Sequence, residues 1–244
     1  MNLSEDKRVT CFLPYSGEEI LSLTVKELRT CKEIDNIFVI CPHSVEGECA
    51  TSLPEGCQGL PAGILQQTQT LKTLASHIDT PYILLYTSAL PLKLGAYSIE
   101  RMLQVISNTD AGMLYADHYK TKKGQLQPHP VNDYQEGSLR DDFDFGSLLL
   151  YNTQAFKAAV SEMNVDYQVA ALYDLRLKIS KYKSLFHLRE FLYTEEETDM
   201  RKSGEKQFDY VNPKNRHVQI EMEQVCTQYL KDTGAWLKPE FSEI

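Results

Sequence analysis

Short apolar runs that alternate with helix-like segments constrain the fold of this chain more than any other feature of its sequence. The apolar runs, each long enough for one buried strand, cover residues 9–13, 37–41, 82–86 and 111–116. Between them, apolar side chains recur at helical spacing in residues 16–31, 62–78 and 95–106. This alternation predicts an α/β fold, with a mostly parallel central sheet and helices on both of its faces.

Local signals mark several boundaries in the first part of the chain. Ser16 and Glu19 have the spacing of a capping box, which predicts that the first helix begins there. Residues 43–63 are rich in Gly, Pro, Ser and Glu, so we expect a loop between elements. Residues 120–142 contain almost no periodic apolar residues, which predicts a long functional loop.

The second half continues the pattern and ends in a helical tail. We expect strands at residues 146–152 and 184–188, and helices at residues 153–163 and 165–180. After a loop over residues 195–215, an apolar stripe predicts a final helix that stops near Gly234; its members are Val218, Met222, Val225, Cys226, Tyr229 and Leu230. We therefore expect a main domain at 1–195 and a C-terminal loop and helix at 196–244. The stripe docks on the main domain or, alternatively, serves a homodimer.

Composition and charge exclude several classes of partner. The chain has 244 residues, 42% of them apolar, which is enough for one large core. With 25 basic and 34 acidic residues its net charge is −9, which argues against nucleic acid and against an anionic membrane surface. No apolar run approaches the length of a membrane span, and the N-terminus lacks the apolar core of a signal peptide. We expect a cytoplasmic protein.

The six cysteines show no spacing typical of zinc. Cys11 and Cys41 lie in apolar runs, where a reduced cysteine packs as a small hydrophobic residue. We expect structural packing for the set, and only Cys49 and Cys57, which flank a polar loop, are candidates to pair or react.

A cluster of acids lies directly before the predicted strand at 146–152. Asp141, Asp142 and Asp144 alternate with Phe143 and Phe145. Like charges held this close raise one another's pKa and repel, so the turn needs a cation, an arginine such as Arg140 or a polar ligand. This makes the turn the leading site candidate. The alternative is an acidic turn exposed to water.

In an open parallel sheet, ligands bind beyond the carboxyl ends of the strands. The residues that follow the four predicted strands are Pro14-Tyr15, Cys41-Pro42-His43, Thr87-Ser88-Ala89 and Asp117-His118. No glycine-rich phosphate loop follows the first strand, which disfavours classical dehydrogenases and P-loop NTPases.

The order of these elements resembles the family 2 glycosyltransferases of the GT-A fold. The resemblance covers about residues 8–195 and is carried by the first strand–helix–strand unit and by a series of short phrases. These are Tyr82-Ile83-Leu84-Leu85, Leu94-Gly95-Ala96, Leu114-Tyr115-Ala116-Asp117, the acidic turn and Leu172-Tyr173-Asp174-Leu175-Arg176-Leu177.

The resemblance implies that a nucleotide-sugar lies over the ends of the first strands. Its donor-binding residues are then Pro14, Tyr15, Thr87, Ser88 and Asp117. The family holds a divalent metal, Mn or Mg, through a D-x-D motif, whose matching positions here are Thr87, Ser88 and Ala89. Hydroxyls can hydrogen-bond a phosphate but cannot neutralise it. Asp117 and His118 are candidate metal ligands in their place, and the alternative is that they form a hydrogen-bonded turn.

The resemblance also implies an acceptor half. An inverting transfer needs a carboxylate to take the acceptor proton, and Tyr173-Asp174 matches the E-D motif that supplies it, so Asp174 is the candidate base. The alternative is a surface ion pair between Asp174 and Lys178. Asp141, Asp142, Phe143 and Asp144 then form a wall of the sugar pocket, where carboxylates accept from hydroxyls and rings stack on the sugar.

Two functions follow from these expectations. The first is a glycosyltransferase of hexosyltransferase type, acting in polysaccharide biosynthesis, which moves a sugar from a nucleotide-sugar to a glycan or lipid-linked acceptor with inversion. The second is a catalytically degenerate relative that binds a sugar or a protein, favoured by the neutral Thr87-Ser88-Ala89. Nucleotidyltransferases rank third, because the glycine-rich basic signature after the first strand is absent.

Overall fold

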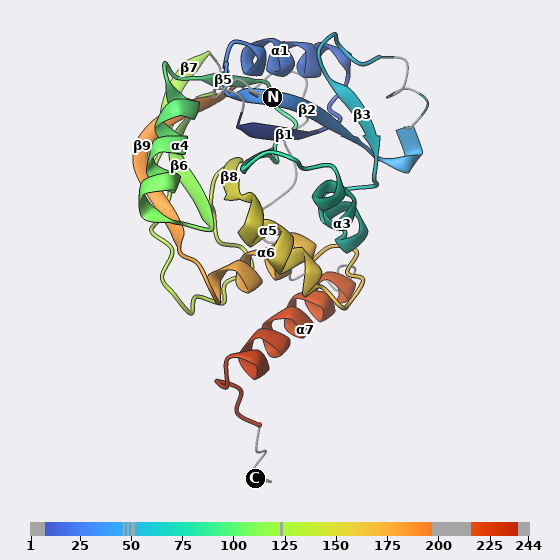
Figure 1. The fold of residues 1–244 in the computed structure, drawn as a ribbon, viewed down its shortest axis with the longest axis vertical. Coiled ribbons are helices and arrows are strands. Elements are labelled where there is room, and N and C mark those ends of the chain that lie inside the picture. The colour runs from blue at the N-terminus through green and yellow to red at the C-terminus, as the bar shows by residue number, and fades with distance from the viewer. Residues whose placement is uncertain are drawn as a thin grey trace, which may run out of the picture.

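A nine-stranded sheet forms the centre of the chain, in the order β3-β2-β1-β4-β8-β6-β9-β5, with β7 paired to β6 (Figure 1). The computed structural model describes residues 8–45, 47, 49, 52–122, 124–196 and 216–238. The strands are β1 (Val9–Pro14), β2 (Ile34–Cys41), β3 (Gln58–Pro61), β4 (Tyr82–Tyr86), β5 (Leu92–Leu94), β6 (Met113–Lys122), β7 (Gln125–His129), β8 (Leu148–Asn152) and β9 (Leu185–Glu196). In the described chain β1, β2, β3, β4, β6 and β9 share one direction, so the mostly parallel sheet is confirmed.

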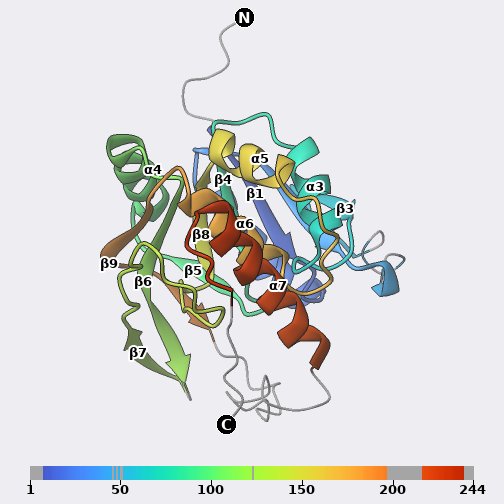
Figure 2. The same ribbon diagram turned by 90° about the horizontal axis from the view of Figure 1, so that it is seen from below.

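Helices cover both faces of the sheet and make two separate cores (Figures 1 and 2). The helices are α1 (Glu18–Arg29), α3 (Thr68–Ser76), α4 (Ser98–Thr109), α5 (Thr153–Ser161), α6 (Ala171–Ser180) and α7 (Arg216–Asp232), with a 3-10 turn at His43–Val45. Helices α1 and α4 pack on one face, around Leu28 and Met102. Helices α3, α5 and α6 pack on the other face, around Leu74, Phe156 and Leu175.

The parallel half follows the apolar runs, with corrections at its turns. Helix α1 begins at Glu18, and Gly17 precedes it with φ 88° and no side-chain cap, so the predicted capping box at Ser16 is wrong. The segment predicted as loop contains β3, which pairs parallel with β2. Helix α3 begins six residues later than predicted, because Gly63 turns the chain at φ +82°.

In the second half of the chain, the sequence predicts strand β8 but not its neighbours in the sheet. Strand β8 lies between β4 and β6 and runs antiparallel to both. Strands β6 and β9 are longer than predicted and pair in parallel. The N-terminal part of the predicted long loop is a hairpin, since β6 continues to Lys122 and β7 returns from Gln125.

Helix α7 docks on α6 through its apolar stripe and one carboxylate. Val225 is 1% exposed and packs with Tyr167, Tyr173 and Leu177. Glu221 accepts hydrogen bonds from the backbone N–H groups of residues 168, 169 and 170, at 2.8 to 3.2 Å. These amides precede helix α6, where a negative charge is favoured by the helix dipole. The predicted loop at 195–215 lies outside the described residues beyond Glu196.

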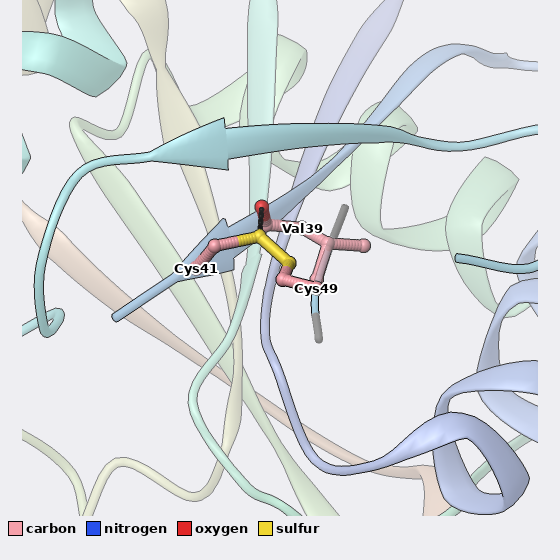
Figure 3. Close-up of a disulfide and its surroundings, with 3 residues drawn as sticks. All are labelled: Val39, Cys41 and Cys49. Atoms are coloured by element: carbon pink, nitrogen blue, oxygen red, sulfur yellow. Dashed lines mark hydrogen bonds between the residues drawn. A yellow bond between two sulfur atoms is a disulfide. The ribbon is translucent and has the colours of Figure 1, made fainter. Parts of the chain in front are cut away.

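A disulfide joins Cys41, the last residue of β2, to Cys49 (Figure 3). Cys49 therefore does pair, but with Cys41 and not with Cys57, and the expectation that Cys41 packs as a free thiol is wrong. Cys57 is free, and its thiol donates to the carbonyl of Pro54 at 3.2 Å.

None of the helices in the described part of the chain combines the length and the apolar composition that crossing a bilayer requires.

Candidate functional site

A cavity of about 350 Å³ lies between the acidic turn and helix α6, beside the end of β4. Its wall brings together residues far apart in sequence: Thr87 after β4, the acidic turn, Tyr173 and Arg176 of α6, and Met222 of α7. The tail helix therefore contributes to the cavity and is not a separate appendage. A volume of this size is in the range of small-molecule sites.

The side chains of the acidic turn contact both the core and the cavity. Phe143 and Phe145 contact each other, with centroids 4.4 Å apart, and both pack on the core beneath α6. Phe145 also meets the edge of Tyr115 at 4.9 Å. These rings anchor the turn and, like Asp141 and Asp144, line the cavity. The predicted wall is thus assembled in part, because Asp142 lies outside the cavity lining.

Two acids of the turn have their own cation or donor, so mutual repulsion does not dominate. Arg140 donates to both oxygens of Asp142, at 3.0 and 3.1 Å, and this lowers the pKa of that carboxyl. Burial alone would raise the pKa of Asp144, but hydrogen bonds from His129 and from the Gly146 N–H, each at 2.8 Å, lower it. Arg140 is confirmed as a compensating cation. The expectation of raised pKa values in these two acids is wrong.

Tyr173 and Arg176 are two of the cavity residues that were not predicted as site residues from the sequence. Tyr173 donates to the Leu139 carbonyl at 2.6 Å and so ties α6 to the segment before the turn. Arg176 is 5% exposed and sits beneath the same turn. The signal in the sequence was an arginine between Leu175 and Leu177 in a helix whose neighbours are buried, which indicates a buried charge.

Of the predicted donor-binding residues, Thr87 lines the cavity. Its N–H and its hydroxyl both donate to the Ser147 carbonyl, at 2.8 and 3.3 Å. The Ser88 hydroxyl accepts from the Leu90 N–H at 3.2 Å, which closes the turn after β4. Pro14 and Tyr15 end β1, where the Tyr15 N–H donates to the Ile40 carbonyl. None of Pro14, Tyr15, Ser88 and Asp117 is part of the cavity lining.

Asp117 and His118 make separate sets of contacts. Asp117 accepts from the Val131 N–H at 2.8 Å and lies 2.9 Å from Nε2 of His187. His118 stacks on Tyr193 at 4.8 Å, and burial lowers its pKa to about 4. No cluster of three or more His, Cys, Asp or Glu side chains suited to a metal occurs within the described residues. The hydroxyls after β4, engaged with Ser147 and Leu90, do not fit a divalent cation either.

Asp174 lies in a different hollow from the acidic turn. It is 4% exposed and lines a space of about 290 Å³ with Tyr167, Lys178 and Asp232. Lys178 donates to its Oδ1, so the ion pair weighed in the sequence analysis is present, but it is buried. Burial raises the pKa of Asp174 and Lys178 opposes that shift. The structure thus separates the predicted base from Thr87, Asp141 and Asp144.

Comparisons with known proteins agree on the architecture. No protein-family model and no curated protein matches the chain. Among solved structures, 4-diphosphocytidyl-2C-methyl-D-erythritol synthase from Anaerococcus prevotii has a TM-score of 0.53 and 11% identity, over 88% of this chain and 100% of that one. Residues 1–349 of S. aureus TarS have a TM-score of 0.51 and 11% identity, over 91% of this chain and 70% of that one. The chain has a GT-A-like fold.

A second structure of S. aureus TarS 1–349, in complex with UDP-GlcNAc, has a TM-score of 0.54 and 10% identity, over 91% of this chain and 71% of that chain. At this identity the likeness concerns the fold alone.

Proposed function

We propose that this chain is a glycosyltransferase that moves a sugar from a nucleotide-sugar donor to a glycan or lipid-linked acceptor with inversion. The observation that carries the proposal is the cavity beside β4, where two carboxylates and an aromatic wall meet on a GT-A-like fold. Carboxylates accept hydrogen bonds from sugar hydroxyls, and aromatic side chains offer apolar area to the ring. The family 2 assignment and a role in polysaccharide biosynthesis belong to this proposal.

We assign proton acceptance to Asp141 in place of Asp174. Both oxygens of Asp144 are engaged, by His129 and by the Gly146 N–H, and Asp174 lines another hollow. Asp141 lines the cavity, and its charge acts on Tyr173 and Arg176 across it. A carboxylate in this position is suited to accept a proton from an attacking hydroxyl.

Calorimetric titration with UDP-, GDP- and dTDP-sugars, with and without manganese, tests donor binding. We expect saturable heat with one of these donors, and no heat with any of them would refute the proposal. Asp141→Asn should lower the rate of transfer at least 100-fold and leave donor binding within about threefold. Asp142→Asn is the matched control, because Asp142 belongs to the same turn but pairs outward with Arg140.

A specific observation favours a second candidate, a sugar-binding module without catalysis. Helix α6 presents Leu172, Tyr173 and Arg176 to the cavity, whereas its carboxylate, Asp174, is held by Lys178 elsewhere. This candidate predicts that a sugar binds, that no donor is consumed, and that Asp141→Asn and Asp174→Asn both keep the cellular role. Loss of that role in either variant counts against it.

A further inference from the structure

Arg176 carries a buried charge that the surrounding residues stabilise but do not neutralise. The guanidinium carbon lies over three rings, at 4.8 Å from the centroid of Tyr173, 5.3 Å from Phe145 and 5.7 Å from Tyr134. Aromatic faces attract a cation without removing its charge. Burial lowers the pKa of Arg176, as expected for a cation taken out of water.

The hydrogen bonding of this guanidinium is incomplete. Nη2 donates to the Arg140 carbonyl at 2.6 Å. Nε is buried and has no partner among the described residues. Within them no carboxylate forms a salt bridge with Arg176, and the charge of Asp141 acts on it from beyond salt-bridge distance. A buried hydrogen-bond donor without an acceptor costs about 1 to 3 kcal/mol, and more when it is charged. Such a donor is retained most readily where a ligand accepts its hydrogen bond.

We propose that Arg176 binds an anionic group, through phosphate or carboxylate oxygens, of the ligand that occupies the cavity. A guanidinium presents its donors in a planar fork that matches both kinds of oxyanion. Thr87, directly after β4, lines the same cavity. The cavity volume of about 350 Å³ accommodates such a group together with a sugar ring.

The source of the anion follows from the proposed function, on which this step rests. A nucleotide-sugar carries a diphosphate, which needs a positive partner, and the hydroxyls after β4 supply none. Arg176 then does electrostatically what a divalent cation does elsewhere. The other source with the same chemistry is the carboxylate of an acidic sugar.

Titrations at constant ionic strength with pyrophosphate, UDP, glucuronate and glucose test the proposal in the wild-type chain. Binding of pyrophosphate and UDP identifies the diphosphate, whereas binding of glucuronate but not pyrophosphate identifies an acidic sugar. We expect Arg176→Met to weaken binding of the anion at least tenfold and Arg176→Lys to weaken it less. Arg101→Met is the control, because Arg101 is an exposed arginine paired with Glu190. If no anion binds the wild type, or Arg176→Met binds it equally, the proposal falls.

A second readout does not depend on the folding of a variant. The ¹H–¹⁵Nε resonance of Arg176 in the wild type should shift on titration, and an unchanged resonance at saturation overturns the proposal.

Failure of the proposed sugar transfer and failure of the proposed Arg176 site give different results. If nucleotide-sugars bind through Arg176 but are never consumed, the proposed sugar transfer is refuted and the Arg176 site stands. If Arg176→Met turns over and binds the donor with wild-type affinity, the Arg176 site is refuted and the sugar transfer stands.

Discussion

At the scale of single residues, His118 shows how burial turns an ordinary side chain into a source of pH dependence. It is 1% exposed, and neither ring nitrogen has a partner among the described residues. Burial lowers its pKa from 6.5 to about 4. Between these pH values the unfolded chain binds a proton that the folded chain does not, so the free energy of unfolding falls as the pH falls.

We therefore expect His118→Phe, which keeps the stack on Tyr193, to flatten the fall in melting temperature between pH 6.5 and pH 4.5. His217→Gln is the control, because His217 is exposed on α7 and should leave the profile unchanged. Melting curves followed by circular dichroism measure the effect. A His118→Phe profile as steep as that of the wild type would contradict the assignment.

The residue scale also shows where sequence reasoning about the site succeeds. The acidic turn was found because its acids and rings are neighbours in the chain. Sequence reasoning misses Arg176 because two of the three rings over it, Tyr134 and Phe145, come from other segments that only the fold brings to α6. Asp174 was placed by its match to a motif, and a motif does not state which side of a helix faces the cavity.

At the scale of elements, the acidic turn depends on a glycine at its end. Gly146 has φ +70°, and a Cβ there would collide with the Tyr193 hydroxyl. We expect Gly146→Ala to lower the free energy of unfolding by about 1 to 3 kcal/mol. Gly137→Ala is the matched control, since Gly137 has φ +82° but open space around it, and it should cost only the backbone strain, about 1 kcal/mol. Equal losses in urea unfolding would show that crowding at Gly146 is unimportant.

The disulfide at the end of β2 determines how many thiols of the chain can be alkylated. With Cys41 and Cys49 paired, the free cysteines are Cys11, Cys31, Cys57 and Cys226. Alkylation of the denatured chain should modify four thiols without reductant and six after reduction, as read by intact mass. Six thiols before reduction would contradict the pairing. Because disulfides are rare in reducing compartments, thiol trapping in cells also tests the cytoplasmic localisation expected from the sequence.

How well each helix or strand can be predicted depends on how much of its position is encoded in its own residues. Strands β1, β2 and β4 each contain a mostly apolar run that is buried by helices, so local sequence identifies them. Strand β3, Gln58–Pro61, has one buried residue, and its pairing with β2 comes from the tertiary fold. Helix ends were misplaced where glycine geometry decides them, at Gly17 and Gly63.

At the scale of the whole molecule, α7 links the tail to the cavity. Glu221 binds three amides that precede α6, and Met222 lines the cavity. We expect Glu221→Ala to lower the free energy of unfolding by about 1 to 2 kcal/mol in urea titrations, because the three amides before α6 lose a charged acceptor. Glu223→Ala, exposed on the same helix, is the control. Identical stabilities would mean that α7 is not docked in solution. The domain boundary at 195/196 and the homodimer remain predictions.

The position of β8 makes completion of the sheet a late event in biosynthesis. Residues 148–152 fill the gap between β4, residues 82–86, and β6, residues 113–122. Until the ribosome has released them, the backbone of β4 has an uncovered flank, to which a strand of another nascent chain can add. Any circular permutant or split version that delays these five residues should aggregate during expression, even when every contact of the finished molecule is preserved.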